Sequence, residues 1–586
     1  MLKIKTGLLL VFFLFWAEGC SQTGGYAPLE QGEVHALTIL HVNDTHSQLE
    51  EGRYAVKIDL GRGPETFYFF LGSQARLTAK VRELMDTEKN PIFLHAGDLV
   101  QGTIYYTKYH GVAGVSLMNL TPPQAMVVGN HEFDVGPERL FNIINQADFP
   151  ILGGNVDASA DPFLSGRLPA YVIEDIDGER VGIIGLITPE TAHSSQPGKT
   201  ISFVDPRETA ARLVAELESQ GVNKIIALTH QGYGEDRELA RRVPGIDVII
   251  GGHSHTLLGD FSALGLDSAG PYPTRETGPD GSLVCIGQDW KWGVGLGVMN
   301  VKFDREGKTI SCDGSPVLLA SDRFLDQDKN EVSAETKAEL TAFISKTPIV
   351  EIVEPDREAA AILAPFTAGL VEYRKTVIAT MAENLWHVRV PGQTHPEGGV
   401  MAHGSLVSPH ISAALLWQAN REGLQADAAL DNAGDAHADL PLGDLTVAAV
   451  YELLPFGNTI YLLQVTGADL TAALERGVTL GDGSFLYPAG LRYKADLNLP
   501  EGQRITVVEI RDAGGVFRPL DRAATYRLAV NSYMANGGGG FDLFNNPEIK
   551  KYDTGFFDAE MFQEYASQNT PLVALEPLIE YTPARK

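Results

Sequence analysis

Short, continuous apolar runs recur through the first half of this 586-residue chain, and each has the length of one β-strand. They alternate with amphipathic stretches, such as residues 74–85 and 207–218, whose spacing is typical of helices. Consecutive Val, Ile and Leu residues usually form strands buried on both faces, as in α/β folds. The alternation predicts a layered α/β domain over residues 37–325. Its strand-like runs are residues 37–42, 92–94, 125–128, 181–186, 225–228 and 248–250.

The remainder of the chain divides into a connector and a second folded region. Residues 326–373 are charged, follow a helical pattern and are interrupted by prolines, which favours a helical linker. A second α/β pattern then begins, with a strand expected at residues 460–465. The next residues, 466–469, resemble the capping box that opens a helix. We therefore expect a C-terminal mixed α/β domain over residues 374–586, so that the whole chain belongs to the α/β (α+β) class.

The charge of the chain narrows its range of partners. Lys and Arg total 46 against 75 Asp and Glu, which gives a formal net charge of −29. A chain this acidic repels nucleic-acid backbones at long range, so we do not expect it to bind nucleic-acid polymers. Apolar residues make up 44% and charged residues 21% of the chain, close to the averages for globular proteins. This composition excludes a mainly disordered, collagen-like or polytopic membrane protein.

Polar side chains follow five of the strand-like runs, at the point where each run ends. They are Asp44 and His46, Asp98, Asn130 and His131, His230, and His253 and His255. In open α/β sheets, ligands bind in the crevice beyond the carboxyl ends of the strands. The pattern therefore predicts that these side chains meet in one site.

The residue types in this set indicate divalent metal ions. Carboxylate, imidazole and amide oxygen suit ions such as Mn²⁺, Zn²⁺ or Fe²⁺. The set is larger than one ion needs, but it is sufficient for two ions if one carboxylate bridges them. Two ions about 3.5–4 Å apart can hold the attacking and leaving oxygens of a displacement at phosphorus. A single histidine at a strand end is more often structural, so only the complete, ordered set of residues indicates metal ions.

Taken in order, the five motifs resemble the pattern of the calcineurin-like metallophosphoesterases, D-x-H, G-D, G-N-H-E, H and G-H-x-H. The surrounding sequences ILHVNDTHSQLE, HAGDLVQGT, VVGNHEFDVG and GGHSHT resemble the bacterial and animal 5'-nucleotidase family. The second half continues the resemblance with ALDNAGDAHADLPLGDLT, LLPFGNTIYLLQVTGADL and NSYMANGGGGFDLF. This resemblance implies an N-terminal calcineurin-like β-sandwich flanked by helices. The helical linker would join it to a 5'-nucleotidase C-terminal domain that binds substrate.

The resemblance also implies a role for each polar residue of the first half. The implied metal ligands are Asp44, His46 and His255 for one ion, Asn130, His230 and His253 for the other, and Asp98 as the bridge. His131 and Asp134 match the catalytic pair of the family. In such a pair the carboxylate orients an imidazole that stabilises developing negative charge. Glu132, inside the same motif, is expected to be a structural hydrogen-bonding residue.

In this family the C-terminal domain holds the nucleoside between two aromatic rings. Phe456 matches one ring and Tyr533 matches the other. Stacking on a pair of rings tolerates many planar groups. Asn432 and Asn458 match asparagines of the same pocket. The resemblance therefore implies that these four residues bind substrate.

The chain departs from the family at positions that grip the nucleotide. His437 stands where the family has a phosphate-binding arginine, and Gly539 stands where it has an aspartate that contacts ribose hydroxyls. The arginines expected early in this domain have no aligned counterpart, and Arg389 is the nearest candidate. Each lost charged partner removes hydrogen bonds of about 1–3 kcal/mol. We therefore expect an intact hydrolytic centre and weak discrimination among nucleotides. His437 is expected to bind substrate, but as a poor substitute for an arginine.

The first residues are expected to be a targeting signal rather than part of the fold. Basic residues precede an apolar run at residues 7–17, which is shorter than the about 20 residues of a membrane-spanning helix. We interpret residues 1–19 as a signal peptide and residues 20–36 as a flexible tether. Cys20 follows the expected cleavage point and resembles the lipid-modified cysteine of bacterial lipoproteins, with plain secretion as the alternative. The mature chain is expected to be extracytoplasmic, in the periplasm or at the cell surface, with a lipid anchor to the membrane through Cys20.

Three cysteines are too few for a disulfide scaffold. Cys285 and Cys312 would meet oxidising conditions outside the cytoplasm and could form one disulfide there. Two buried thiols are the alternative, and the sequence leaves both states open.

Three functions fit these observations. The leading interpretation is a phosphohydrolase of the 5'-nucleotidase type, which hydrolyses nucleotide phosphomonoesters by attack of a metal-activated hydroxide and uses two divalent ions such as Zn or Mn. One alternative keeps the metal centre but acts on a non-nucleotide substrate, as the related thiosulfohydrolases do. The departures from the nucleotide contacts favour this alternative, and the match at PFGN opposes it. The other alternative is a non-catalytic surface binding protein, against which the complete ligand set argues.

Overall fold

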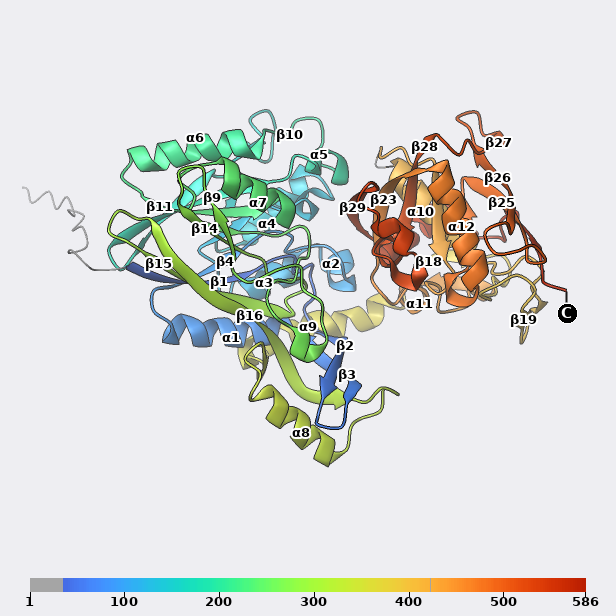
Figure 1. Cartoon of the computed structure of the whole chain (residues 1–586), viewed down its shortest axis with the longest axis horizontal. Helices are drawn as coiled ribbons and strands as arrows, with labels where there is room; N and C mark the ends of the chain where they lie inside the picture. The colour runs from blue at the N-terminus through green and yellow to red at the C-terminus, as the bar shows by residue number, and fades with distance from the viewer. Residues whose placement is uncertain (1–34, 422, 586) are drawn as a thin grey trace, which may run out of the picture.

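The computed structural model describes residues 35–421 and 423–585 (Figure 1). The expected signal peptide, Cys20 and nearly all of the expected tether lie outside these residues. Within the described ranges, none of the helices combines the length and the apolar character needed to cross a membrane.

Two large β-sheets form the core of the first half. The first sheet comprises, in order, β2 (Glu51–Asp59), β3 (Pro64–Gly72), β16 (Thr309–Leu325), β15 (Gly295–Phe303), β1 (His35–Val42), β4 (Pro91–His95), β5 (Ala125–Val127) and β6 (Ile151–Leu152). The second sheet comprises β13 (Thr274–Thr277), β14 (Leu283–Gly287), β12 (Val248–Ile250), β11 (Lys224–His230), β9 (Glu179–Ile187) and β8 (Tyr171–Ile176). The strands β1, β4, β5 and β6 are parallel neighbours, and so are β9, β11, β12 and β14.

The two sheets pack on each other through the apolar runs predicted as strands. Leu37 and Ile92 of the first sheet share one buried cluster with Ile226 and Val248 of the second. Helices α1 (Gln74–Thr87) and α4 (Pro137–Gln146) pack in a cluster on the first sheet, and α6 (Pro206–Ser219) and α7 (Tyr233–Arg242) pack on the second. The expected sandwich flanked by helices is therefore confirmed.

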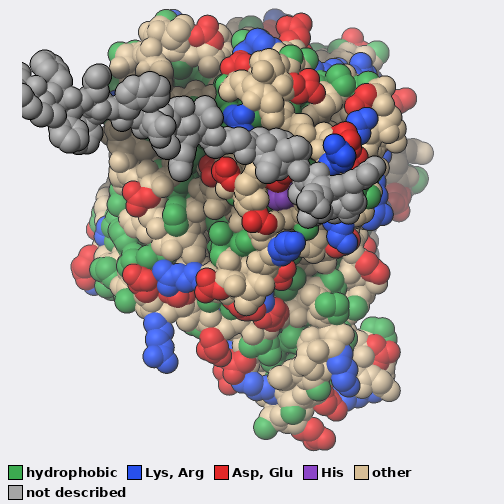
Figure 2. All heavy atoms as spheres, turned by 90° about the vertical axis from the view of Figure 1, so that its left-hand side faces the viewer, with side chains coloured by type: hydrophobic (Ala, Val, Ile, Leu, Met, Phe, Trp, Pro, Cys, Tyr) green, Lys and Arg blue, Asp and Glu red, His purple; other side chains and the backbone are tan. Residues whose placement is uncertain are grey.

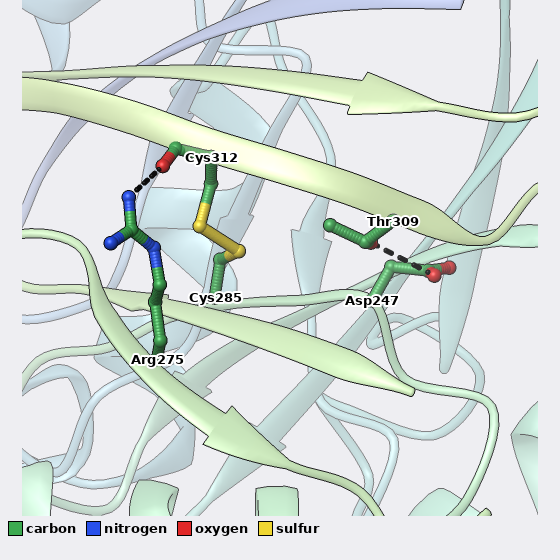
Figure 3. The surroundings of a disulfide bond; sticks show 5 residues. All are labelled: Asp247, Arg275, Cys285, Thr309 and Cys312. Atoms are coloured by element: carbon green, nitrogen blue, oxygen red, sulfur yellow. Dashed lines mark hydrogen bonds between the residues drawn. A yellow bond between two sulfur atoms is a disulfide. The ribbon is translucent and has the colours of Figure 1, made fainter. Parts of the chain in front are cut away.

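A disulfide joins the two sheets inside this core (Figure 3). Cys285 lies on β14 and Cys312 on β16, and both are buried. The guanidinium of Arg275 donates to the carbonyl oxygen of Cys312 at 2.6 Å. Nearby, Thr309 of β16 donates to Asp247, just before β12, at 3.1 Å. The structure thus contains the disulfide, one of the two states that the sequence left open.

Residues 326–373 contain α8 (Ala334–Ile344) and α9 (Arg357–Tyr373), with the short strand β17 (Val350–Ile352) between them. We did not expect this strand. β17 pairs in parallel with β16, and its Val350 is buried in the same cluster as Leu340 of α8. This part of the chain therefore extends the first sheet as well as leading to the second half.

The second half is built on a five-stranded sheet. Its strands are, in order, β24 (Leu486–Ala489), β21 (Ala428–Asn432), β28 (Thr525–Asn531), β23 (Thr459–Thr466) and β29 (Lys550–Phe557). One face packs against α10 (Ser408–Arg421), α11 (Val447–Leu453) and α14 (Asp558–Gln568), and the other packs against α12 (Gly467–Leu480). A second sheet contains β27 (Phe517–Pro519), β26 (Ile505–Arg511), β25 (Leu491–Asp496) and β30 (Ile579–Thr582). The expected mixed α/β architecture is confirmed, and α12 opens with the expected capping box between Thr466 and Asp469.

Charged side chains of both signs cover the face of the N-terminal half drawn in Figure 2. Acidic and basic side chains are interspersed there, and hydrophobic ones lie singly or in small groups.

The disulfide gives the first testable prediction. Replacing Cys285 and Cys312 together by alanine should lower the free energy of unfolding of the sandwich by about 3–4 kcal/mol, because the bond closes a loop with a sequence separation of 27. Urea unfolding of the variant and of the oxidised wild-type protein measures this difference. A loss below about 1 kcal/mol would show that the bond contributes little.

Candidate metal centre and substrate pocket

The loops that follow β1, β4, β5, β11 and β12 bring the expected metal ligands together. Their donor atoms form three groups, each lying within 4.8 Å: Asp44, His46 and His255; His46, Asp98 and His131; and Asp98, His230 and His253. His46 and Asp98 each belong to two groups, and Asp98 is the carboxylate of the two. His131 also lies in one group, although we expect it to act in chemistry rather than as a ligand.

The distances within the cluster suit shared metal ions. The Nε2 atom of His230 lies 3.0 Å from Oδ2 of Asp98, and Nε2 of His255 lies 3.5 Å from Oδ1 of Asp44. The amide oxygen of Asn130 lies 3.1 Å from Nε2 of His230 and 2.9 Å from Nδ1 of His253. Ligand atoms about 2.0–2.2 Å from one ion are separated by about 3–3.5 Å. The donor set therefore fits the divalent metals that its chemistry indicates.

Backbone strain is concentrated in the same loops. The φ angles of Asp44, His46, Asp98, His253 and His255 are 51°, 48°, 56°, 75° and 50°. Non-glycine residues rarely adopt such left-handed conformations, which persist only where the surrounding structure enforces them and which are frequent at functional sites. The sandwich thus holds these residues in conformations that isolated loops would avoid.

Two glycines in the metal motifs are required by close approach. A Cβ atom at Gly129 would lie 2.1 Å from Oδ1 of Asp98. At Gly97, where φ is +87°, a Cβ atom would lie 2.5 Å from Nδ1 of His230. The G-D and G-N pairs therefore allow the two loops to lie against the ligands.

Glu132 organises the loop that carries Asp98. Its buried carboxylate accepts the backbone N–H groups of Asp98, Leu99, Val100 and Gly129 at 3.1, 2.9, 3.3 and 2.7 Å. These bonds fix the β4 loop against the β5 loop. This is the structural hydrogen-bonding role that we expected for Glu132.

Asn43 is a supporting residue that the sequence analysis did not identify. Its side-chain nitrogen donates to Oδ2 of Asp44 at 2.6 Å and to the carbonyl oxygen of Trp290 at 2.7 Å. Its side-chain oxygen accepts the backbone N–H of Asp289 at 2.8 Å. Asn43 thereby ties Asp44 to the segment after β14, and only its position beside Asp44 could have suggested this.

His131 and Asp134 form a buried pair. The Nδ1 atom of His131 lies 2.6 Å from Oδ2 of Asp134, and Ser195 donates to Oδ1 of Asp134 at 2.8 Å. Burial disfavours the charged imidazole, but the carboxylates of Asp134 and Asp98 outweigh this and raise the pKa of His131 to about 10. Ser195, which the sequence analysis did not identify, holds the carboxylate of Asp134, and this carboxylate orients the imidazole of His131.

The C-terminal half covers the cluster with the end of β29. A Cβ atom at Gly555 would lie 1.8 Å from Nε2 of His131, so the backbone itself faces that nitrogen. The ring of Phe557 lies edge-on to His46, with the centroids 5.8 Å apart. Beyond it, the half-buried carboxylate of Glu560 accepts from Thr107 at 2.8 Å and from Gln101. In this arrangement the backbone of β29 lies where a group bound to His131 would sit.

The expected substrate residues Asn432, Phe456, Asn458 and Tyr533 line one pocket of about 610 Å³. The rings of Phe456 and Tyr533 are half exposed, at 53% and 51%. Gly539 also lines the pocket. None of the described residues that line it belongs to the metal cluster.

Both asparagines of the pocket are engaged by the protein. Asn432 donates to the carbonyl oxygen of Gly483 at 3.0 Å and accepts from Asn531 at 2.8 Å. Asn458 donates to Asp435 at 2.7 Å and accepts from Ser532 at 3.1 Å. Their present contacts therefore hold the pocket walls.

His437 lies outside the lining of this pocket. It is exposed and packs edge-on against Phe456, with the ring centroids 4.7 Å apart and the planes at 84°. Arg389, the nearest arginine by sequence, reaches the rim of the pocket by binding Asp482, which lines it. Arg389 has no aligned counterpart in the family, and the tertiary fold brings it to this rim.

Two family models match the chain. The calcineurin-like phosphoesterase model matches residues 37–257, and the 5'-nucleotidase C-terminal domain model matches residues 396–546. A probable 5'-nucleotidase of Treponema pallidum is 34% identical over 570 residues, which cover 94% of this chain and 92% of that protein. The NAD 5'-nucleotidase of Haemophilus influenzae is 31% identical over 553 residues, which cover 91% of this chain and 90% of that protein.

Solved structures agree with these matches. The NAD nucleotidase of Haemophilus influenzae superposes with a TM-score of 0.84 at 28% identity, covering 94% of this chain and 100% of that one. The 5'-nucleotidase precursor of Thermus thermophilus gives a TM-score of 0.57 at 37% identity with the same coverage. Because relatives above 30% identity span nearly the whole chain, this protein belongs to the 5'-nucleotidase family and is a metal-dependent hydrolase of phosphoric esters.

Proposed function

We propose that this chain hydrolyses nucleotide phosphomonoesters outside the cytoplasm with two divalent metal ions. The observation that carries the proposal is the position of Asp98, whose Oδ2 lies 3.8 Å from Nε2 of His46 and 3.0 Å from Nε2 of His230. The names of the relatives, 5'-nucleotidase and NAD 5'-nucleotidase, support a nucleotide as the substrate. The apolar leader and Cys20 support a lipid anchor.

Asp98 would be a ligand of both ions, and the other ligands would each hold one. We assign Asp44, His46 and His255 to one ion, Asn130, His230 and His253 to the other, and Asp98 to both. Zinc or manganese suits these nitrogen and oxygen donors. When bound, such ions neutralise phosphate charge and lower the pKa of coordinated water.

His131 would stabilise the charge that develops on the phosphoryl and leaving oxygens. Asp134 binds Nδ1 and so directs Nε2 away from itself, and Ser195 keeps Asp134 in place. A buried imidazole held by a carboxylate stabilises an anion without reorganising during the reaction. Phe456 and Tyr533 would meanwhile hold the base by stacking.

The substrate has to reach His131 while it is held by the two rings. Gly555 faces Nε2 of His131 in this structure, and the lining of the aromatic pocket does not include the described metal-cluster residues. We therefore infer that β29 and the aromatic pocket move relative to the cluster during turnover. Glu560, which binds Thr107 and Gln101 across the two halves, lies on the surface that would separate.

A panel of substrates tests the proposed function. Hydrolysis of nucleoside monophosphates should exceed that of cyclic nucleotides, sugar phosphates and thiosulfate conjugates, stop on chelation, and return with zinc or manganese. Phosphate or sulfate release after metal depletion and reconstitution measures this. Turnover of a thiosulfate conjugate with no nucleotide hydrolysed would reject a nucleotidase.

Asp98→Asn should reduce activity more than His255→Ala, because Asp98 serves both ions and His255 serves one. Metal analysis of each purified variant should show a larger loss of bound metal for Asp98→Asn. Asp148→Asn, at an exposed aspartate, is the control. A fully active Asp98→Asn protein with two equivalents of metal would refute the bridge.

His131→Ala should lower kcat by about 10²–10⁴-fold, the usual contribution of a charge-stabilising or acid–base group. Its metal content should stay close to that of the wild-type protein, since Asn130 already supplies a ligand from this loop. His403→Ala, at an exposed histidine, is the matched control and should retain activity. Loss of metal together with the imidazole would instead make His131 a ligand.

A further inference from the structure

We propose that Asp482, positioned by Arg389, binds the ribose hydroxyls of the nucleotide and gives the enzyme a preference for ribonucleotides over deoxyribonucleotides. This inference rests on the proposed nucleotide substrate. Asp482 would determine specificity, and Arg389 would position it. The sequence predicted neither role.

Asp482 lies beside Gly539 on one wall of the aromatic pocket. It belongs to the loop 481–484 between α12 and β24, and it lines the pocket with Phe456, Tyr533 and Gly539. Ser484 of this loop donates to the carbonyl oxygen of Gly539 at 2.8 Å, which holds the loop against the segment that carries Gly539. A sugar attached to a base stacked on the two rings would therefore lie near Asp482 and Gly539.

The carboxylate of Asp482 has acceptors to spare. The Nη1 atom of Arg389 lies 3.0 Å from Oδ1 and 2.9 Å from Oδ2, and the side chain of Asp482 is 71% exposed. An ionised carboxylate offers about four acceptor positions, two on each oxygen. One position therefore remains on each oxygen. The vicinal hydroxyls of ribose present two donors, and acidic side chains bind them in other nucleotide sites.

The other polar side chains of the pocket are buried or already hydrogen-bonded. Asp435 is 2% exposed; its Oδ1 accepts from Asn458 at 2.7 Å, and its Oδ2 is buried without a hydrogen-bond partner. Asn432 is held by Gly483 and Asn531, and the hydroxyl of Ser484 donates to Gly539. Among the described residues that line the pocket, Asp482 is thus the exposed carboxylate. The hydrogen bond from Arg389 holds the pKa of Asp482 below its usual value, so this side chain stays ionised at neutral pH.

Both members of the Arg389–Asp482 pair are fixed in place. The backbone of Asp482 has a φ of 45°, in the left-handed region that aspartate tolerates better than most residues, and its carbonyl oxygen accepts from the N–H of Phe485 at 3.2 Å. The N–H of Arg389 donates to Gln393 at 3.0 Å, and its carbonyl oxygen accepts from the buried Tyr487 hydroxyl at 3.2 Å. Arg389 therefore presents its guanidinium from an anchored backbone.

Gly539 itself is a poor place for a carboxylate in this chain. Its φ is +65°, and a Cβ atom there would lie 3.3 Å from the ring of Tyr533. A side chain at this position would strain the backbone and press on the stacking ring. Supply of the carboxylate from the adjacent loop avoids both costs.

This arrangement revises our expectation of weak discrimination among nucleotides. A site built to bind a hydroxyl rejects an analogue that lacks it, because its polar group is then left without a partner. We expect kcat/KM for adenosine 5'-monophosphate to exceed that for its 2'-deoxy analogue by about tenfold to a hundredfold, as befits a hydrogen bond to a charged group.

The test compares these two substrates in variants of the full-length, metal-loaded enzyme. Asp482→Ala should bring the ratio of their kcat/KM values to within about threefold, mainly by raising KM for the ribonucleotide. Asp482→Asn, which keeps the shape and one acceptor, should give an intermediate ratio, and so should Arg389→Met. The control is Asp512→Asn, because Asp512 forms a similar exposed pair with Arg518 at 3.1 Å outside the pocket. This control should keep the wild-type ratio.

Equilibrium binding separates this inference from the proposed function. Titration calorimetry with adenosine and 2'-deoxyadenosine measures the hydroxyl contact without hydrolysis. Tighter binding of adenosine that is lost in Asp482→Ala supports the inference even if no nucleotide is hydrolysed. Nucleotide hydrolysis with a wild-type ratio near one, or with a ratio that Asp482→Ala leaves unchanged, overturns the inference and leaves the proposed function standing. If neither nucleoside binds and no nucleotide is hydrolysed, both fail.

Discussion

The contact between Asp98 and His230 depends on the packing of the two sheets, and the metal cluster depends on that contact. Asp98 follows β4 of the first sheet, and His230 ends β11 of the second. Their side chains meet at 3.0 Å because the apolar faces of both sheets are buried against each other. The left-handed conformation of Asp98 is unfavourable alone, and the four backbone bonds to Glu132 enforce it. The hydrophobic core thus supplies the free energy that holds strained ligands in place.

This dependence explains why so much of the site could be predicted from the sequence. Parallel strands end at a common edge, so polar residues after consecutive apolar runs have to converge there. His230 and Asp98 were expected in one site on this basis. Asn43 and Ser195 were not, because each acts through contacts with residues distant in the sequence, such as Trp290 and Asp134. Single polar residues of this kind carry no periodic signal.

The C-terminal half shows the same limit more strongly. The matches at Phe456 and Tyr533 predicted that both rings bind substrate, and in the structure both line one pocket. The partnership of Arg389 with Asp482 joins residues 93 positions apart, and it depends on two loops that no hydrophobic pattern describes. β17 was missed for a related reason. It is too short for a pattern to reveal, and its pairing with β16 is set by tertiary packing.

Near the metal centre, part of the contact between the two halves is polar. The carboxylate of Glu560 binds Thr107 and Gln101, and Thr107 also lies 3.4 Å from the hydroxyl of Tyr451. Such groups regain hydrogen bonds to water when an interface opens, so each bond to the carboxylate contributes about 1.5–3 kcal/mol to closure and the contact between the two hydroxyls about 0.5–1.5 kcal/mol. Burial raises the pKa of Glu560 to about 7, which shows that this carboxyl would also gain from exposure to solvent. Apolar groups also meet across the two halves, since Tyr105 and Val447 share one buried cluster. The chemistry of this contact therefore permits the relative movement that a substrate needs to pass from the aromatic pocket to the metal cluster.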